Sequence, residues 1–194
     1  VACEFGYNKG IFGFGNDGTY TGVTNLVSNA GVVATDVTAV GTARKNIAAT
    51  EYGYDKGIFG YGTTGSATAV TNLVSNAGVV ATDVTGVGTA RQTLAACGYG
   101  YDKAIFGYGY DTDNSSLTNL VSNVGVVATD VTGVGTARHA LAACEYGYDK
   151  GIFGYGTTGS VTAVTNLVSN AGVVATDVTG VGTAREGPAA CSFN

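Results

Sequence analysis

The stretch 56–62, Lys-Gly-Ile-Phe-Gly-Tyr-Gly, decides the fold of this chain. Its β-branched, aromatic and glycine residues are typical of a buried strand rather than of a helix. Because side chains alternate along a strand, we expect Phe59 and Tyr61 on one face of a sheet and Ile58 with the glycines on the other. A bulky aromatic face and a flat glycine face complement each other when identical sheets stack. The stretch therefore predicts sheets that are buried on both faces.

This stretch belongs to a unit of 47 residues that occurs four times without insertion or deletion. The period is marked by Arg44, Arg91, Arg138 and Arg185. Units of constant length are typical of identical stacking, because a slipped unit would misalign its contacts with both neighbours. We therefore treat 1–194 as a single repeat domain with units at 1–47, 48–94, 95–141 and 142–188, followed by a duplicate of the first strand at 189–194.

Each unit is expected to form four strands. In the third unit they are Leu94–Cys97, Lys103–Tyr108, Leu117–Ser122 and Val126–Val131. A tight hairpin is expected at 123–125, Asn-Val-Gly, because Asn and Gly tolerate positive φ. No stretch shows sustained helical periodicity. Four strands in about 40–50 residues is the size of a WD40 or kelch blade, so the sequence predicts an all-β propeller of four four-stranded blades.

The order of residues within a unit also resembles the kelch repeat. In the third unit the resemblance is carried by Arg91, Leu94, Ile105, Phe106, Gly107 and Gly109. Gly-Tyr-Gly stands where that family has a pair of glycines, and the later Trp is absent. The resemblance implies kelch-like blades, and the repeats are also similar to those of phage and bacterial surface proteins. It implies an extracellular or virion-associated location.

The composition excludes several kinds of partner. Only 12% of residues are charged and the net charge is −5, whereas binding to nucleic acid needs clustered Lys and Arg. No apolar run approaches the ~18 residues of a membrane-spanning helix. We expect no cofactor and no metal.

The two copies of the terminal strand, 1–6 and 189–194, leave three alternatives open. The ends of the chain lie side by side, with Cys3 and Cys191 as a candidate disulfide that closes a ring; this would contribute about 4–5 kcal/mol in the chain-entropy model. Alternatively, the spare strand pairs with a neighbouring molecule and builds a homo-oligomer or fibre. In the third alternative, the chain is a piece of a longer array.

The residues that could support catalysis recur in a way that favours structural roles. The repeated cysteine position holds Thr50 in the second unit, so buried thiols are favoured over a ring of metal ligands. An aspartate precedes each repeat arginine by eight residues, which favours an ion pair or a turn cap. His139 is the only histidine, and its position accepts other polar residues, so we expect it in solvent. No Ser-His-Asp or Cys-His arrangement is visible, and we expect no catalytic residues and no enzyme.

The loop after the second strand is where the four copies differ, and binding residues concentrate on such loops. The candidate partner or ligand residues there are Asp17, Tyr20, Tyr110, Asp111, Asp113 and Asn114. Neutral drift of an exposed loop is the competing explanation, and the spacing of Asp111 and Asp113 only partly resembles a calcium loop. The tyrosines near 52–54, 99–101 and 146–148 could stack on sugars, although their repetition favours packing between blades.

We therefore expect a non-enzymatic structural or adhesive module of a virion or cell surface that binds protein or glycan and self-assembles through its duplicated terminal strand. The alternative is a lectin-like propeller with several equivalent carbohydrate sites.

Overall fold

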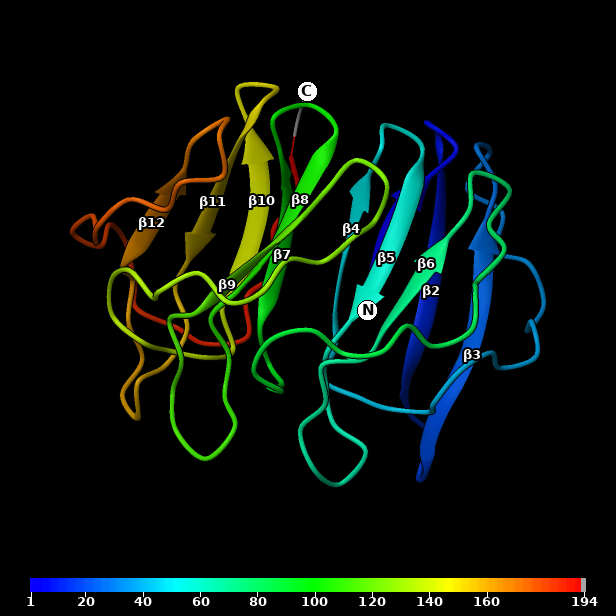
Figure 1. Ribbon diagram of the computed structural model, residues 1–194, viewed down its shortest axis with the longest axis horizontal. Helices are drawn as coiled ribbons and strands as arrows, with labels where there is room; N and C mark the ends of the chain where they lie inside the picture. The colour runs from blue at the N-terminus through cyan, green and yellow to red at the C-terminus, as the bar shows by residue number, and fades with distance from the viewer. Residues whose placement is uncertain (193–194) are drawn as a thin grey trace.

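The computed structural model describes residues 1–192, and every regular element in this range is a β-strand. No helix that could cross a membrane occurs among these residues. The strands form four antiparallel sheets of three, each made of strands that are consecutive in the chain (Figure 1). In chain order the strands are β1 (Ala2–Phe5), β2 (Lys9–Asn16), β3 (Tyr20–Val27), β4 (Ala48–Tyr52), β5 (Lys56–Gly60), β6 (Thr71–Val74), β7 (Ala95–Tyr99), β8 (Lys103–Gly107), β9 (Thr118–Val121), β10 (Ala142–Tyr146), β11 (Lys150–Gly154) and β12 (Thr165–Val168).

The predicted all-β class is confirmed, but the predicted count of four strands in each blade is wrong. The segment after β6 pairs with it only through isolated bridges, Thr71 with Val84 and Val74 with Val80. Between these bridges the carbonyl of Ala81 accepts a hydrogen bond from the Asn72 side chain, at 3.1 Å. A side chain thus enters the ladder where a backbone amide would continue it, and the outermost segment stays irregular.

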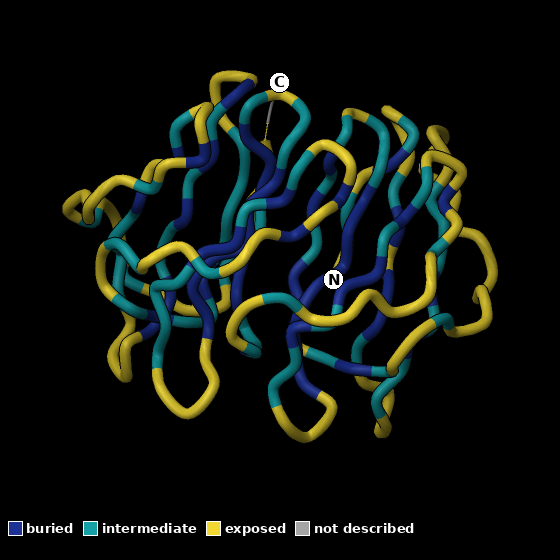
Figure 2. The backbone as a smooth tube through the Cα atoms, in the orientation of Figure 1, coloured by how far each residue is buried: buried dark blue, intermediate teal, exposed yellow. Residues whose placement is uncertain are grey.

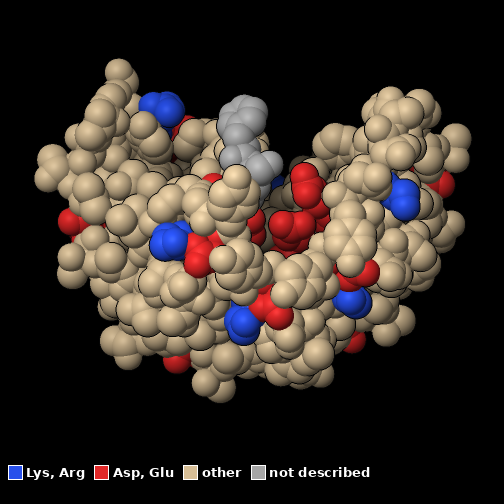
Figure 3. Space-filling view, turned by 90° about the horizontal axis from the view of Figure 1, so that it is seen from above, with Lys and Arg blue, Asp and Glu red and all other residues tan. Residues whose placement is uncertain are grey.

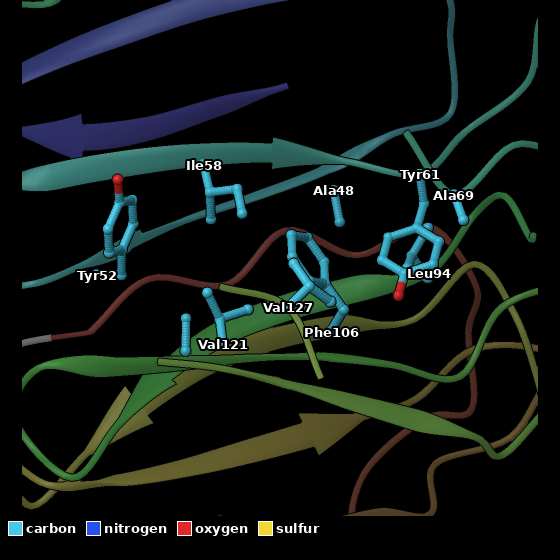
Figure 4. Packing of buried hydrophobic residues seen from close by; sticks show 10 residues of the cluster. Ala48, Tyr52, Ile58, Tyr61, Ala69, Leu94, Phe106, Val121 and Val127 are labelled. Carbon is cyan, nitrogen blue, oxygen red and sulfur yellow. The ribbon is translucent and has the colours of Figure 1, made fainter. Parts of the chain in front are cut away.

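The predicted match of aromatic and glycine faces is confirmed. Phe106 of the third sheet lies on Gly60 of the second, so closely that a Cβ on Gly60 would come within 2.6 Å of the ring. Phe59 lies on Gly13, and Phe153 on Gly107, in the same way. These contacts join the sheets into continuous apolar clusters, and Figure 4 shows the one between the second and third sheets.

The prediction that Phe59 and Tyr61 share a face is wrong. Phe59 contacts Phe14 of the first sheet, with ring centroids 5.2 Å apart. Tyr61 instead contacts Phe106 of the third sheet, at 5.1 Å. The reason is that Tyr61 has a φ of 64°, which interrupts the alternation of the strand and turns its ring to the side of Gly60. The second and third sheets therefore present Phe to one neighbour and Tyr to the other, whereas the first sheet presents Phe14 to the second.

The sheets follow one another around a hollow in a β-propeller-like arrangement. The innermost strands contact in the order β1, β4, β7, β10, and Figure 3 shows the hollow from above. Buried backbone runs along the strands, while the turns at both edges are exposed (Figure 2). This series of contacts forms an arc with two end faces, the outer face of the first sheet and the outer face of the fourth.

Candidate functional site

The hollow of the arc contains an acidic cavity. The innermost strands and residues 190–192 line a space of about 210 Å³. Glu4, Glu51 and Glu145 contribute carboxylates to its wall, and Figure 3 shows acidic side chains gathered in the hollow. The third sheet has Gly98 at the equivalent position, and the carboxylate of Glu145 lies where a side chain on Gly98 would stand. Three carboxylates thus share one cavity.

The surroundings of Glu51 in this cavity raise the pKa of its carboxyl group. Burial raises the pKa of its carboxyl group to about 7, and the charges of Glu145 and Glu4 add to the shift. Within the described part of the chain, no group of three or more His, Cys, Asp or Glu residues has the arrangement of a metal site.

The cysteines also line the cavity, and two of them pack against the next sheet. The sulfur of Cys3 lies against Gly57, and that of Cys97 against Gly151. The equivalent pair at the remaining junction is Thr50 and Ala104, so both departures from the repeat fall at a single contact. Burial raises the pKa of the Cys3 thiol to about 12, which disfavours its thiolate form.

The two cysteines of the candidate disulfide, Cys3 and Cys191, are both free in the structure. Cys191 instead lies beside Cys144, whose pKa is raised first by burial and then by the Cys191 thiol. The pKa of Cys97 is raised by burial and, in part, by Cys144 in the same manner. The described part of the duplicate strand, 189–192, therefore follows β10 as a further innermost segment, although it is not a strand. Residues 193–194 lie outside the described residues.

The repeated arginine holds neighbouring sheets together. Arg91 is fully buried, its guanidinium lies 4.6 Å from the centre of the Tyr61 ring, and its Nε donates to the carbonyl of Tyr108 in the next sheet at 2.7 Å. Its Nη2 donates to Oδ1 of Asn119, at 2.6 Å. Asp130 completes the contact by accepting hydrogen bonds from the backbone amide and the hydroxyl of Thr89. We call this set of contacts the junction.

The junction shows the partners of the repeated aspartate, for which the sequence predicted an ion pair or a turn cap. Asp130 lies 3.8 Å from Arg91, in the preceding unit, rather than pairing with the arginine eight residues after it. The structural role is as predicted, but the contact is between units. Thr89 and Asn119 were not predicted as members of this site. Their presence at the same position in all four units was the signal that could have found them.

The predicted loop residues fall into two separate groups at one edge of the arc, at the bottom of Figure 1. In the third unit, the ring of Tyr110 packs on His139 with centroids 5.1 Å apart. Nδ1 of the same histidine lies 2.6 Å from Oδ1 of Asn114. The expectation that His139 is solvated is therefore wrong, because it is half-buried against the variable loop. Asp111 and Asp113 are exposed on that loop.

The second group lies in the hairpin between β2 and β3. Asp17 is exposed and accepts two hydrogen bonds from Thr19, each at 3.0 Å, which lower the pKa of its carboxyl group. Tyr20 is half-buried, with Nζ of Lys45 5.3 Å from the centre of its ring. The second unit and its loop lie between the two groups, so the structure does not bring the six predicted residues into one site.

The opposite edge, at the top of Figure 1, carries an exposed tyrosine on the first hairpin of every sheet. We call this set the tyrosine row, and its members are Tyr7, Tyr54, Tyr101 and Tyr148. All four have a φ between 67° and 69°, which is strained for an aromatic residue. At the other repeated position Tyr52 and Tyr99 are buried, as the packing explanation predicts, whereas Tyr146 of the fourth sheet is exposed. Sequence repetition alone did not separate the two kinds.

Hydrogen bonds between sheets fix the spacing of the tyrosine row. The amide of Gly53 donates to the carbonyl of Asp102 in the next sheet at 2.8 Å, and the other two junctions repeat this bond. Asp102 also binds Nζ of Lys103 at 2.7 Å. This hydrogen bond raises the pKa of Lys103, and the nearby Tyr54 phenol adds to the shift. Tyr54 thus stands beside the Asp–Lys pair of the following sheet, and so does Tyr101.

Several of the repeated polar side chains make contacts within the fold. Within residues 1–192, the single histidine contacts an asparagine and a tyrosine, and the repeated arginines and aspartates hold the sheets together. The exposed groups are the tyrosine row at one edge, the variable loops at the other, and the cavity carboxylates between them. Compared with known proteins, the chain matches no family model, and no curated protein matches its sequence.

Proposed function

We propose that this chain is a non-enzymatic adhesive or structural module of a virion or cell surface, and that it binds its partner through the tyrosine row. The observation that carries the proposal is the exposure of the same strained tyrosine on all four sheets, with Tyr7 at 75% and Tyr148 at 67%. Tyrosine offers a large, rigid and amphipathic contact at low entropic cost. Four of them at a fixed spacing favour an extended partner.

Support also comes from the way in which the strain is maintained. A positive φ in a bulky residue persists only where its surroundings over-determine it. In the first three sheets the glycine before the tyrosine is held by a backbone bond to the next sheet, as Gly6 is by the carbonyl of Asp55 at 2.7 Å. The ring is therefore oriented before any partner arrives. Such pre-organisation reduces the entropic cost of binding.

The test compares two sets of four substitutions at equivalent exposure. In one variant all four members of the tyrosine row become Ala. In the control, four valines of the outer segments become Ala. They are 63–65% exposed and occupy the same place in each unit: Val32, Val79, Val126 and Val173. Binding to a glycan array and to surfaces coated with cell-surface protein is measured for both variants. We expect the tyrosine variant to lose at least about tenfold in affinity and the valine variant to bind like the wild type. Equal binding by all three chains would contradict the proposal.

A lectin-like function is the second candidate, because two rings of the tyrosine row have a charged pair beside them. Tyr54 stands by Lys103 and Asp102, and Tyr101 stands by Lys150 of the following sheet. An aromatic face beside hydrogen-bonding groups is suited to a sugar ring. Titration calorimetry with an oligosaccharide that the array identifies distinguishes the two candidates. Several equivalent sites in each chain support the lectin, and binding to protein surfaces alone supports the adhesive module.

A further inference from the structure

The two end faces of the arc are the separated halves of one junction. At each internal junction, a Gly-Thr-Ala-Arg segment of one unit meets an Asn and an Asp of the next unit. The segment at 182–185 has no following sheet to meet, and the receiving pair of the first sheet, Asn25 and Asp36, has no preceding segment. Three internal copies thus show what the two end faces would contact.

The outer face of the fourth sheet already has the conformation of a donor half. Nη1 of Arg185 donates to the carbonyl of Thr183 at 3.1 Å, as Arg91 does to Thr89 at 3.0 Å. The guanidinium of Arg185 lies 3.9 Å from the centre of the Tyr155 ring, as Arg91 lies over Tyr61. Unlike Arg91, however, Arg185 is exposed.

Two glycines of this face are open where their internal equivalents are covered. A Cβ on Gly154 would meet only Thr165, whereas one on Gly60 or Gly107 would strike a phenylalanine ring. A Cβ on Gly182 would approach only the Tyr155 hydroxyl, at 3.7 Å, whereas one on Gly88 would strike the Asp130 carboxylate. The places of the missing Phe and Asp are therefore vacant on this face.

The outer face of the first sheet has the conformation of a receiving half. Asn25 donates to the carbonyl of Ala34 at 3.2 Å and to Asp36 at 2.8 Å. Asn72 makes the equivalent bonds, at 3.1 and 2.9 Å. The ring that would cover a glycine is Phe12, which is 50% exposed, while its three internal equivalents are fully buried.

We propose that these faces bind each other between two copies of this chain, the receiving face of one copy on the donor face of the second. In this contact Phe12 covers Gly154 and packs on Tyr155, while Arg185 and Thr183 bind Asn25 and Asp36. The contact is heterologous, and two such contacts related by a two-fold axis close a ring. Two arcs of four sheets give eight blades, which lies within the range of known propellers.

Charge and shape both favour this occupant over an unrelated protein. The donor face presents the Arg185 cation and a flat glycine, and the receiving face presents the Asp36 carboxylate and a projecting phenylalanine. The same pairing is already made at three junctions within the chain, where Arg44, Arg91 and Arg138 are fully buried. The contact uses neither the tyrosine row nor the variable loops, so it is independent of the proposed function.

The first experiment measures the mass in solution by light scattering at concentrations up to about 100 μM, where a contact of micromolar affinity is saturated. We expect about twice the chain mass of 19.3 kDa. One variant of each face, Phe12→Asp and Arg185→Glu, should each weaken association at least about tenfold. Both side chains are exposed, so each variant should keep the circular dichroism and melting temperature of an isolated arc. A monomeric wild type, or a dimer that neither variant weakens, overturns the proposal.

Mixing the two variants tests the head-to-tail arrangement. The Phe12→Asp chain keeps an intact donor face and the Arg185→Glu chain an intact receiving face, so the mixture should form a heterodimer through one contact. A symmetric interface between two receiving faces or two donor faces would not produce a heterodimer of the two variants. If no heterodimer forms, the head-to-tail arrangement is contradicted. Binding through the tyrosine row is measured on the same chains. A wild type that forms the dimer but shows no binding through the tyrosine row would count against the proposed function alone.

Discussion

The position of Glu51 in the hollow of the arc makes its contribution to stability depend on pH. Its neighbours are the carboxylates of Glu4 and Glu145, and burial raises its pKa to about 7 from 4.5. Between these two values the folded chain binds more protons at Glu51 than the unfolded chain does. The contribution of Glu51 to stability therefore falls as the pH rises from about 4.5 to 7, and its full cost is present above pH 7.

We expect Glu51→Gln to stabilise the chain at pH 8 and to have little effect near pH 4.5. The gain at pH 8 should be about 1 kcal/mol, because solvent screens a half-buried group. Urea unfolding of wild type and variant at both pH values measures the difference. Glu186→Gln, at an exposed position, serves as the control. An equal effect of Glu51→Gln at the two pH values would show that its ionisation is not coupled to folding.

Residues also show what the sequence could and could not predict. The pairing of Phe106 with Gly60 followed from strand alternation, which is a local rule. The turn of Tyr61 toward the next sheet did not follow, because a positive φ in tyrosine has no sequence signature. The partner of Asp130 was missed for another reason. Spacing within a unit cannot show that the contact lies between units.

At the scale of the strand, stacking depends on glycine at the centre of each sheet. Gly60 lies under the Phe106 ring, whereas Gly154, at the same repeat position, is open. Neither glycine has a positive φ, so alanine changes only the space that each residue occupies. The chain thus contains its own matched control.

We expect Gly60→Ala to destabilise the chain by about 1–3 kcal/mol through overpacking, and Gly154→Ala to stay within about 0.5 kcal/mol of the parent. Both substitutions are made in the Phe12→Asp chain, so that association does not contribute. The free energy of unfolding in urea is the measurement. A similar loss for both variants would mean that the close contact with Phe106 does not limit the packing of the sheets.

Strands were more predictable than their number in each sheet. The first three strands of the third unit were expected at Leu94–Cys97, Lys103–Tyr108 and Leu117–Ser122, and the structure has β7, β8 and β9 within two residues of most of these bounds. The fourth was expected from its β-branched residues, which follow the Asn-Val-Gly turn. It failed because the Asn119 amide binds the carbonyl of Ala128, at 3.0 Å, and interrupts the ladder. Competition from a side chain is not visible in the hydrophobic pattern.

For the whole molecule, the sequence predicted identical units but could not fix how they are arranged around the hollow. That arrangement depends on the small rotation from one sheet to the next, which the junctions set through Arg44, Arg91 and Arg138. The arc that results has one donor face and one receiving face. Polarity of this kind is a property of any stack of identical units joined by heterologous contacts. It leads to a specific role for the duplicate of the first strand.

Segment 189–192 occupies the innermost place on the donor face, since Cys191 lies beside Cys144. In a head-to-tail dimer, β1 of the second copy would need that place. β1 is already paired with β2 from Ala2–Phe12 to Phe5–Lys9, whereas 189–192 is exposed and forms no ladder. We therefore expect β1 of the second copy to displace segment 189–192. This displacement weakens association of the complete chain.

Truncation after Pro188 should accordingly strengthen the dimer, because no segment then competes with β1. Sedimentation equilibrium should show a dissociation constant at least about tenfold lower for the truncated chain, which corresponds to about 1.4 kcal/mol. The same truncation in the Arg185→Glu chain controls for non-specific association through newly exposed surface, and that chain should remain monomeric. Weaker association after truncation would mean instead that 189–192 itself takes part in the contact, by pairing with β2 of the second copy in place of β1.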